Sequence, residues 1–271
     1  MIELKLIGIG TGNVEHLTFQ AVRVLQDADL VLIPRKGADK ADLAELRRTI
    51  CATHVGDATR LVEFDLPVRD VGAPRYLDGV HAWHDAIAEA WAERIALHLP
   101  RGGRVALLVW GDPSLYDSSL RIAQRLRAAG LALRIEVIPG LTSVQLLTAA
   151  HAIPLNTLGA PVLITTGRRL KAGGWPPGLD TVVVLLDGDC AFQHLPDRDV
   201  TIYWAAYLGM PNQLLLAGPL ADAGPRIVRA RAEARRAHGW IMDSYLLRRG
   251  GESGESGESD ERDVLDPVPT R

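Results

Sequence analysis

The stretch LKLIGIGTG, residues 4–12, decides the fold. Its mostly apolar first part is typical of a strand that is buried on both faces, as in a parallel sheet. The glycines at positions 8, 10 and 12 follow directly. Glycines there allow a tight turn and a close approach of the backbone to a ligand. We therefore predict a ligand-binding turn at the carboxyl end of a first parallel strand.

The alternation of strands and helices continues to about residue 143. Further strands are predicted at 30–33, 60–64, 105–110 and 134–138, and helices at 17–26, 43–51, 76–99 and 120–129. Strands that alternate with helices indicate a parallel α/β sheet, with ligands at the carboxyl ends of its strands. Residues 1–143 are therefore predicted to form a Rossmann-like N-terminal α/β domain.

The second half of the chain is predicted to form another α/β domain, over residues 144–249, with a mixed sheet. Strands are expected at 162–166, 181–186, 201–206, 213–217 and 240–247, and helices at 142–151 and 226–237. The arginines of the last helix are interpreted as a solvated face or a subunit contact. The tail, 250–271, begins GGESGESGES from position 250. It has too little apolar surface to offset its ordering entropy, which predicts disorder.

Bulk composition limits the possible functions. The chain has 271 residues and a formal net charge of −3, without the basic excess of a nucleic-acid binder. It contains no apolar stretch of about 18 residues, so no membrane span is predicted. The first residues are read as a strand and not as a signal peptide. Only two cysteines occur, Cys51 and Cys190. This favours a reducing compartment, and we expect the cytoplasm.

Two further turns follow predicted strands. Trp110–Tyr116, WGDPSLY, places a carboxylate in a glycine-containing turn. Such a carboxylate can accept hydrogen bonds from ribose hydroxyls or an ammonium group, although Asp-Pro turns are also common in plain loops. The segment IPGLTS, 138–143, puts Thr142 and Ser143 at the start of a helix. Their hydroxyls can cap the helix or hold the polar edge of a ligand.

Taken together, these segments resemble a known family. GIGTGNVEHLT, GDPSLY and VIPGLTSVQLL, in this order and each after a strand, resemble the signature segments of the tetrapyrrole methylases. Longer segments resemble the branch that removes an acetyl group from a corrin precursor: KGADKADLAELRRTIC, LVWGDPSLYDSSLRI, ITTGRRL, IYWAAYLG and HGWIMDSYLLRR. The resemblance covers residues 1 to about 249. Thr11 stands where many members carry proline, which leaves the role of that side chain open.

The resemblance implies two α/β domains with S-adenosylmethionine in the cleft between them, S-adenosylhomocysteine as a product, and a homodimer. Carried over motif by motif, the cofactor-binding residues are Thr11, Gly111, Asp112, Leu115, Thr142, Ser143, Leu186, Asp187, Ala205, Ala206 and Trp240.

The resemblance also implies a substrate like precorrin-5, which loses an acetyl group and gains a methyl group at ring carbon 1. Hydrolysis of the acetyl group needs a general base, for which Asp117 and Asp243 are candidates, with Tyr116 as a donor to the carbonyl. Arginines suit the substrate carboxylates. The candidates for that contact are Arg69, Arg75, Arg168, Arg169, Lys171, Arg248 and Arg249. No metal is expected, because the histidines lack ligand spacing.

Three alternatives stay open. The first is a methyltransferase that acts on another corrinoid intermediate. The second is an NAD-dependent oxidoreductase, which the sequence IPRK at 33–36 disfavours because it lacks the acidic residue expected after the second strand. The third is a non-catalytic tetrapyrrole carrier.

Overall fold

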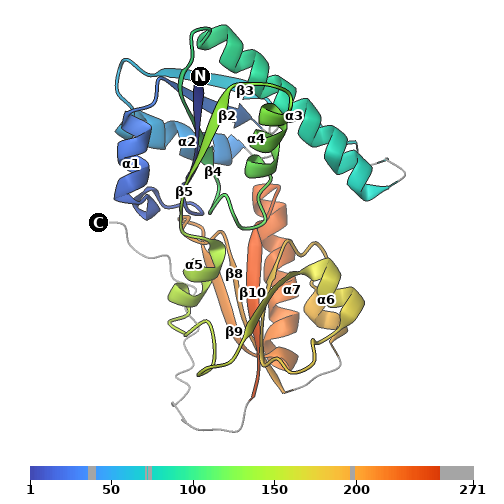
Figure 1. Cartoon of the computed structure of the whole chain (residues 1–271). Helices are drawn as coiled ribbons and strands as arrows, with labels where there is room; N and C mark the ends of the chain where they lie inside the picture. The colour runs from blue at the N-terminus through green and yellow to red at the C-terminus, as the bar shows by residue number, and fades with distance from the viewer. Residues whose placement is uncertain (36–40, 71, 73–74, 196–198, 251–271) are drawn as a thin grey trace. The chain divides into compact units, whose positions relative to one another are not determined.

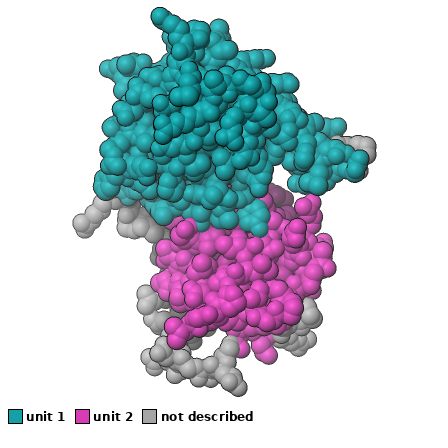
Figure 2. Space-filling model, in the orientation of Figure 1, with its two compact units in different colours: residues 1–142 teal, residues 143–271 magenta. Residues whose placement is uncertain are grey.

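The computed structural model describes residues 1–35, 41–70, 72, 75–195 and 199–250 (Figure 1). The chain divides into two compact units, residues 1–142 and 143–271, which Figure 2 colours separately. Each unit contains a five-stranded sheet. Residues 36–40 of one family-like segment lie outside the described residues, and so does the acidic tail beyond Gly250.

Unit 1 alternates strands and helices throughout. Its elements are β1 (Ile2–Gly8), η1 (Val14–His16), α1 (Phe19–Gln26), β2 (Leu30–Arg35), α2 (Ala41–His54), β3 (Arg60–Asp65), α3 (Tyr76–His98), β4 (Gly103–Val109), α4 (Ser119–Ala128) and β5 (Leu133–Ile138). The strand order is β3-β2-β4-β1-β5, and every pair is parallel. The parallel sheet predicted from the sequence is confirmed.

Helices cover both faces of this sheet. Successive side chains of a strand point to opposite faces, so the same strand contributes to two cores. Leu4 of β1 lies in a core that includes Trp91 of α3 and residues of α4. Ile7 of the same strand lies in a second core, with Leu25 of α1 and Cys51 of α2. Each fully buried side chain of this size contributes about 1.5–3 kcal/mol. The apolar run of β1 is therefore explained by burial on two sides.

Unit 2 contains the mixed sheet. Its elements are α5 (Ser143–Ala150), β6 (Val162–Thr166), α6 (Gly167–Gly173), β7 (Thr181–Leu185), η3 (Ala191–His194), β8 (Val200–Ala206), β9 (Leu214–Pro219), α7 (Leu220–His238) and β10 (Asp243–Arg249). The strand order is β6-β7-β10-β8-β9, in which only the β6–β7 pair is parallel. The mixed sheet predicted for this half is confirmed.

Helices α5 and α7 lie on opposite faces of the second sheet (Figure 1). His151, just after α5, packs its ring edge-on against Tyr203 of β8. The next residue of that strand, Trp204, points to the other face. There its Nε1 and the Nε of Arg231 of α7 both donate to the Asp243 carboxylate. Strand alternation therefore sends Trp204 of β8 and Asp243 of β10 toward α7.

Three boundaries in unit 2 differ from the sequence prediction. Helix α6 was not predicted, because its sequence, GRRLKAG, shows no apolar period and only Leu170 is a buried large apolar residue. Helix α7 begins at Leu220 and not at 226, with Pro225 inside it, although a Gly-Pro pair usually marks a turn. Strand β10 begins at Asp243, since Gly239 ends α7 with a φ of 75° and Trp240 packs onto Tyr207.

Both cysteines are buried and unpaired, and burial raises the pKa of the Cys51 thiol to about 11. Among the residues that the structure describes, no helix is long and apolar enough to span a membrane.

Candidate functional site

The three glycine-containing turns of unit 1 lie side by side, because they follow the neighbouring strands β4, β1 and β5. The Gly111 N–H donates to the Gly10 carbonyl at 2.8 Å. A Cβ on Gly140 would lie 2.5 Å from the carbonyl oxygen of Gly111, and one on Gly8 would lie 2.6 Å from the amide nitrogen of Gly140. Only glycine permits such an approach. The structure thus places these three turns in direct backbone contact.

Asp112 joins the turns after β4 and β5. Its Oδ1 accepts from the Ser114 N–H at 2.8 Å and from the Ser114 hydroxyl at 2.5 Å. Its Oδ2 accepts from the Gly140 N–H at 2.8 Å. Burial alone would raise the pKa of Asp112, but these hydrogen bonds hold it below the usual value. Both oxygens of this side chain therefore bind the protein itself and fix the shape of the turns.

The other residues predicted to bind the cofactor in this region surround those turns. Thr11 is buried and lies beside Gly111. Leu115 is half-buried in the turn after β4. Thr142 and Ser143, also half-buried, lead from the turn after β5 into α5. The structure therefore gathers the predicted cofactor residues of this part of the chain at the carboxyl ends of the strands. We call them the N-terminal group: Thr11, Gly111, Asp112, Leu115, Thr142 and Ser143.

Tyr116 and Asp117 continue the turn after β4. Tyr116 has a left-handed backbone with a φ of 50°, and 45% of the residue is exposed. The Asp117 Oδ1 accepts from the Ser119 N–H at 2.6 Å. Arg47 of α2, a buried residue that sequence reasoning missed, donates to the Leu108 carbonyl at 2.9 Å. Burial lowers the pKa of Arg47 to about 10, and the charge of Asp117 opposes that shift.

In unit 2, the turn after β7 repeats the arrangement of the turn after β4. Leu186 has a left-handed backbone with a φ of 53°, compared with 68° for Gly111, and an aspartate follows each of them. Asp187 is buried like Asp112, whereas Leu186 is 67% exposed. The fold therefore presents an apolar side chain on a backbone conformation that leucine rarely adopts.

Asp187 is bound by the protein on both oxygens. Its Oδ1 accepts from the Asp189 N–H at 3.0 Å, and its Oδ2 accepts from the Ala191 N–H and the Tyr245 hydroxyl, each at 2.6 Å. A Cβ on Gly167 would lie 2.3 Å from the carboxyl carbon of Asp187, so this position requires glycine. Burial, together with the nearby Asp187 carboxylate, raises the pKa of Tyr245.

Ala205, Ala206 and Trp240 lie close to one another in unit 2. The two alanines end β8, pair with the start of β10 and are fully buried. Tyr207 follows them, and its hydroxyl donates to the Trp240 carbonyl at 2.6 Å. The Tyr207 and Trp240 rings meet edge to face, with centroids 5.2 Å apart. The two alanines and Trp240 thus belong to one packed end of the strands β8 and β10.

Asp243 forms an internal ion pair. Its Oδ2 accepts from the Arg231 Nε and from the Trp204 Nε1, each at 2.9 Å. Burial raises the pKa of Asp243, although the charge of Arg231 opposes that shift. The interpretation of Arg231 as part of a solvated face is wrong, because only 11% of its side chain is exposed. Ala223, Ile227 and Ala234 are buried, and Arg231 continues their helical spacing of three to four residues. This spacing could have indicated that Arg231 lies on the inward face of the helix.

Two of the arginines proposed for substrate carboxylates have partners inside unit 2. The Arg248 Nη2 donates to the carbonyls of Pro154 and Leu155, at 2.8 and 3.0 Å. The Arg249 guanidinium carbon lies 4.3 Å from the ring centroid of Trp175. These contacts favour structural roles for both side chains.

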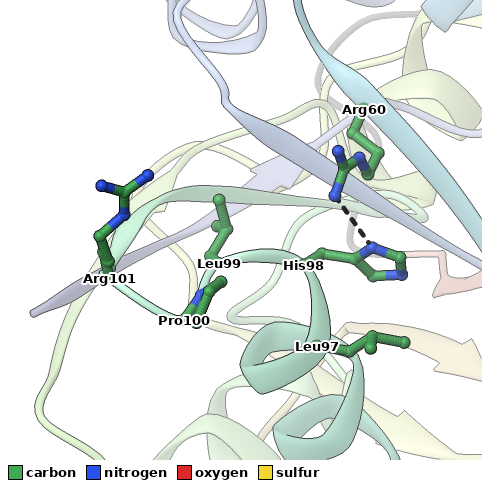
Figure 3. Close-up of a pocket in the computed structure, with 7 residues that line it drawn as sticks. Arg60, Leu97, His98, Leu99, Pro100 and Arg101 are labelled. Carbon is green, nitrogen blue, oxygen red and sulfur yellow. Dashed lines mark hydrogen bonds between the residues drawn. The ribbon is translucent and has the colours of Figure 1, made fainter.

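A hollow of about 430 Å³ lies at the other end of the first sheet, where β3 and β4 begin. It is lined by Arg60 and residues 97–102, and Arg60 and His98 point toward each other with 3.2 Å between Nη1 and Nδ1 (Figure 3). None of the predicted site residues lines it. Within the described part of the chain, no cluster of His, Cys, Asp and Glu could hold a metal ion.

Comparison with known proteins identifies the family of this chain. Residues 3–224 match the model of the tetrapyrrole (corrin/porphyrin) methylases. The precorrin-6A synthase (deacetylating) of Sinorhizobium sp is 48% identical, over 93% of this chain and 97% of that protein. A chloroplastic S-adenosyl-L-methionine-dependent uroporphyrinogen III methyltransferase of Arabidopsis thaliana is 28% identical, over 82% of this chain and 50% of that one.

Solved structures show the same architecture. The putative cobalamin synthesis related protein CobF of Corynebacterium diphtheriae superimposes with a TM-score of 0.79 at 38% identity, over 92% of this chain and 99% of its own. The uroporphyrin-III C-methyltransferase of Thermus thermophilus, complexed with S-adenosylhomocysteine, gives 0.54 at 18% identity, over 91% and 92%, and shows the fold alone. By the family match and by these relatives, the chain belongs to the tetrapyrrole (corrin/porphyrin) methylases.

Proposed function

We propose that this protein is a precorrin-6A synthase, a methyltransferase that deacetylates and methylates precorrin-5 at ring carbon 1. The observation that carries this proposal is the 48% identity to the Sinorhizobium enzyme, which extends over almost the full length of both chains. The NAD-dependent alternative loses its basis, since the family that the chain belongs to consists of methylases.

The reaction has a hydrolytic and a methyl-transfer part. Water adds to the acetyl carbonyl, the bond from that carbon to ring carbon 1 breaks, and acetate leaves while the electron pair stays on the ring carbon. S-adenosylmethionine, when bound, supplies the methyl group that this carbon takes up, and S-adenosylhomocysteine is released. Because the donor is already activated, the task of the protein is to orient the reactants and to exclude water from the second part.

The site residues suit an adenosyl ligand. The N-terminal group offers close-approaching backbone and the hydroxyls of Thr142 and Ser143, which match a sugar and an amino-acid end. In unit 2, the exposed Leu186 offers apolar surface of the kind that a flat base covers. We assign direct contact to the backbone of Gly111 and to these side chains, and we assign Asp112 and Asp187 to holding the turns.

For the hydrolytic part, we propose Asp117 as the general base and Tyr116 as a donor to the acetyl carbonyl. Tyr116 is 45% exposed in the turn after β4, and Asp117 is half-buried next to it. Asp243 has less support in this role, because its Oδ2 accepts from Arg231 and Trp204 and only 7% of its side chain is exposed.

We also propose that the enzyme is a cytoplasmic homodimer. The resemblance to the family supports the dimer, and the two buried, unpaired cysteines suit a reducing compartment. Sedimentation equilibrium of the full chain tests the oligomeric state, and a monomer at micromolar concentration would contradict it.

The decisive experiment follows both products. The purified protein is incubated with precorrin-5 and methyl-labelled S-adenosylmethionine, and labelled corrinoid and free acetate are measured together. We expect them in equal amounts. Methyl incorporation without acetate would indicate another corrinoid methyltransferase, and binding of the corrinoid without either product would indicate a carrier.

A further inference from the structure

The turn after β7 is held in an unfavourable conformation. Leu186 and Cys190, four residues apart, both have left-handed backbones, with φ of 53° and 56°. Such a conformation costs free energy for any residue with a Cβ, and it persists only where the surroundings enforce it. Leu186 gains little from burial, because 67% of it is exposed. Other residues must therefore hold this turn in place.

Arg231 provides such a hold from α7. Its Nη2 donates to the Asp187 carbonyl at 2.6 Å, and its Nη1 donates to the Gly188 carbonyl at 3.1 Å. These are the two carbonyls that follow Leu186 directly. A guanidinium can bind both at once, because its donors form a rigid planar fork, which an ammonium group lacks.

The other side of Arg231 is anchored in the sheet. Its Nε donates to Oδ2 of Asp243, which also accepts from the Trp204 Nε1 of β8. The side chains of Arg231 and Asp243 are 11% and 7% exposed. An ion pair this deeply buried contributes little net stability, since the desolvation of its charges offsets their attraction. Its geometry instead connects α7, β8 and β10 to the turn after β7.

We propose that Arg231 is a positioning residue of the methyltransferase. It holds Leu186 in the left-handed conformation in which this residue meets the adenosyl ligand, and Asp243 orients Arg231 for that task. The inference rests on the proposed function, because only there is Leu186 a cofactor-binding residue. Arg231 itself does not touch the cofactor or the substrate.

The test compares two conservative substitutions on α7. Arg231→Lys keeps the charge but loses the fork, whereas Arg235→Lys, four residues further along the helix, changes an exposed arginine. We expect Arg231→Lys to raise the Kd of S-adenosylhomocysteine and the KM for S-adenosylmethionine about tenfold, the order of effect of one lost charge-assisted hydrogen bond. We expect kcat to change less than about threefold. Arg235→Lys should match the wild type in all three constants.

A second background separates positioning from general support of the fold. In a Leu186→Gly chain, residue 186 adopts the left-handed conformation without strain. The effect of Arg231→Lys on the Kd should then fall from about tenfold to less than about threefold, a coupling that a double-mutant cycle measures. An equal effect of Arg231→Lys in both backgrounds would show general structural support and would overturn the inference.

The remaining outcomes are also decisive. If Arg231→Lys folds, by circular dichroism, and binds S-adenosylhomocysteine like the wild type, Arg231 is not a positioning residue, and the proposed function still stands. If the wild type itself binds no S-adenosylhomocysteine in calorimetry, the proposed function fails, and this inference fails with it. Should Arg231→Lys not fold, Asp243→Asn takes its place. That variant keeps an acceptor for Arg231, so we expect a rise of about threefold in the Kd, and an unchanged Kd would contradict the proposal.

Discussion

Two aspartates, Asp112 and Asp187, hold the turns after β4 and β7 in the same way. In both, one carboxylate oxygen accepts the N–H two residues on, and the other accepts a backbone N–H from a later segment of the chain. Sequence reasoning predicted both residues as cofactor-binding, and for Asp112 it predicted hydrogen bonds from ribose hydroxyls or an ammonium group to the carboxylate. It could not reveal that these oxygens accept hydrogen bonds from the protein itself. The donors include the N–H groups of Gly140 and Ala191, and nothing in the sequence around these residues indicates such a contact.

This geometry leads to a prediction at Asp112. Asp112→Asn leaves one acceptor oxygen and turns an amide toward Ser114 or Gly140, so one side of the contact is lost. We expect both Asp112→Asn and Asp112→Ala to destabilise the protein by about 1–3 kcal/mol and to raise the Kd of S-adenosylhomocysteine about tenfold. Urea denaturation and calorimetry measure the two effects. Wild-type affinity in Asp112→Asn would show that the second oxygen is dispensable.

At the scale of elements, the close contact of three turns depends on glycine. In Gly140→Ala the new Cβ would meet backbone atoms of Gly111 and Gly8, which cannot rotate away. We expect a loss of more than about 2 kcal/mol in the free energy of unfolding and at least about tenfold weaker binding of S-adenosylhomocysteine.

Gly173→Ala is the matched control, because nothing lies within 4 Å of the added Cβ. It should stay within about 0.5 kcal/mol of the wild type in denaturant titration. An equal loss in both variants would mean that the contact between the turns is not the cause.

Elements with a continuous apolar run or a helical apolar period were predictable from the sequence, whereas α6 and the start of α7 were not. The buried strand β4 and the long helix α3 lie within two residues of their predicted bounds. Helix α6 is short and polar, and α7 continues through Pro225, so tertiary packing decides both. The inward position of Arg231 was missed because a run of arginines usually indicates a solvated face.

At the scale of the whole molecule, several carboxylates make stability depend on pH. The pKa of Asp29 is lowered by its ion pair with Arg104, that of Asp180 by Thr157, and that of Asp112 by hydrogen bonds that overcome burial. A lowered folded-state pKa stabilises the protein above the unfolded value, 3.8, and this stabilisation is lost as the pH falls through the folded value. Asp243 has the opposite effect on stability. Burial raises its pKa, so this carboxyl group favours the unfolded state as the pH rises.

Burial also lowers the pKa of His16, His84 and His151 from 6.5, so the unfolded chain binds their protons first as the pH falls. We therefore expect the free energy of unfolding to change little between about pH 7 and 8, to decrease below about pH 6.5, and to fall most steeply below about pH 4. Urea titrations across this range give the curve. In Asp112→Asn the acid-side slope should be shallower, and an unchanged slope would remove Asp112 as a contributor.

The order of the second sheet has a consequence for synthesis on the ribosome. β10, the last described strand, lies between β7 and β8 and pairs with both. Until residue 249 has left the exit tunnel, β7 and β8 lack their shared neighbour and expose unpaired edges to other chains. A nascent chain that stalls before β10 can complete its first sheet but not its second. We expect such stalled chains to be digested by protease only from about residue 143 onward.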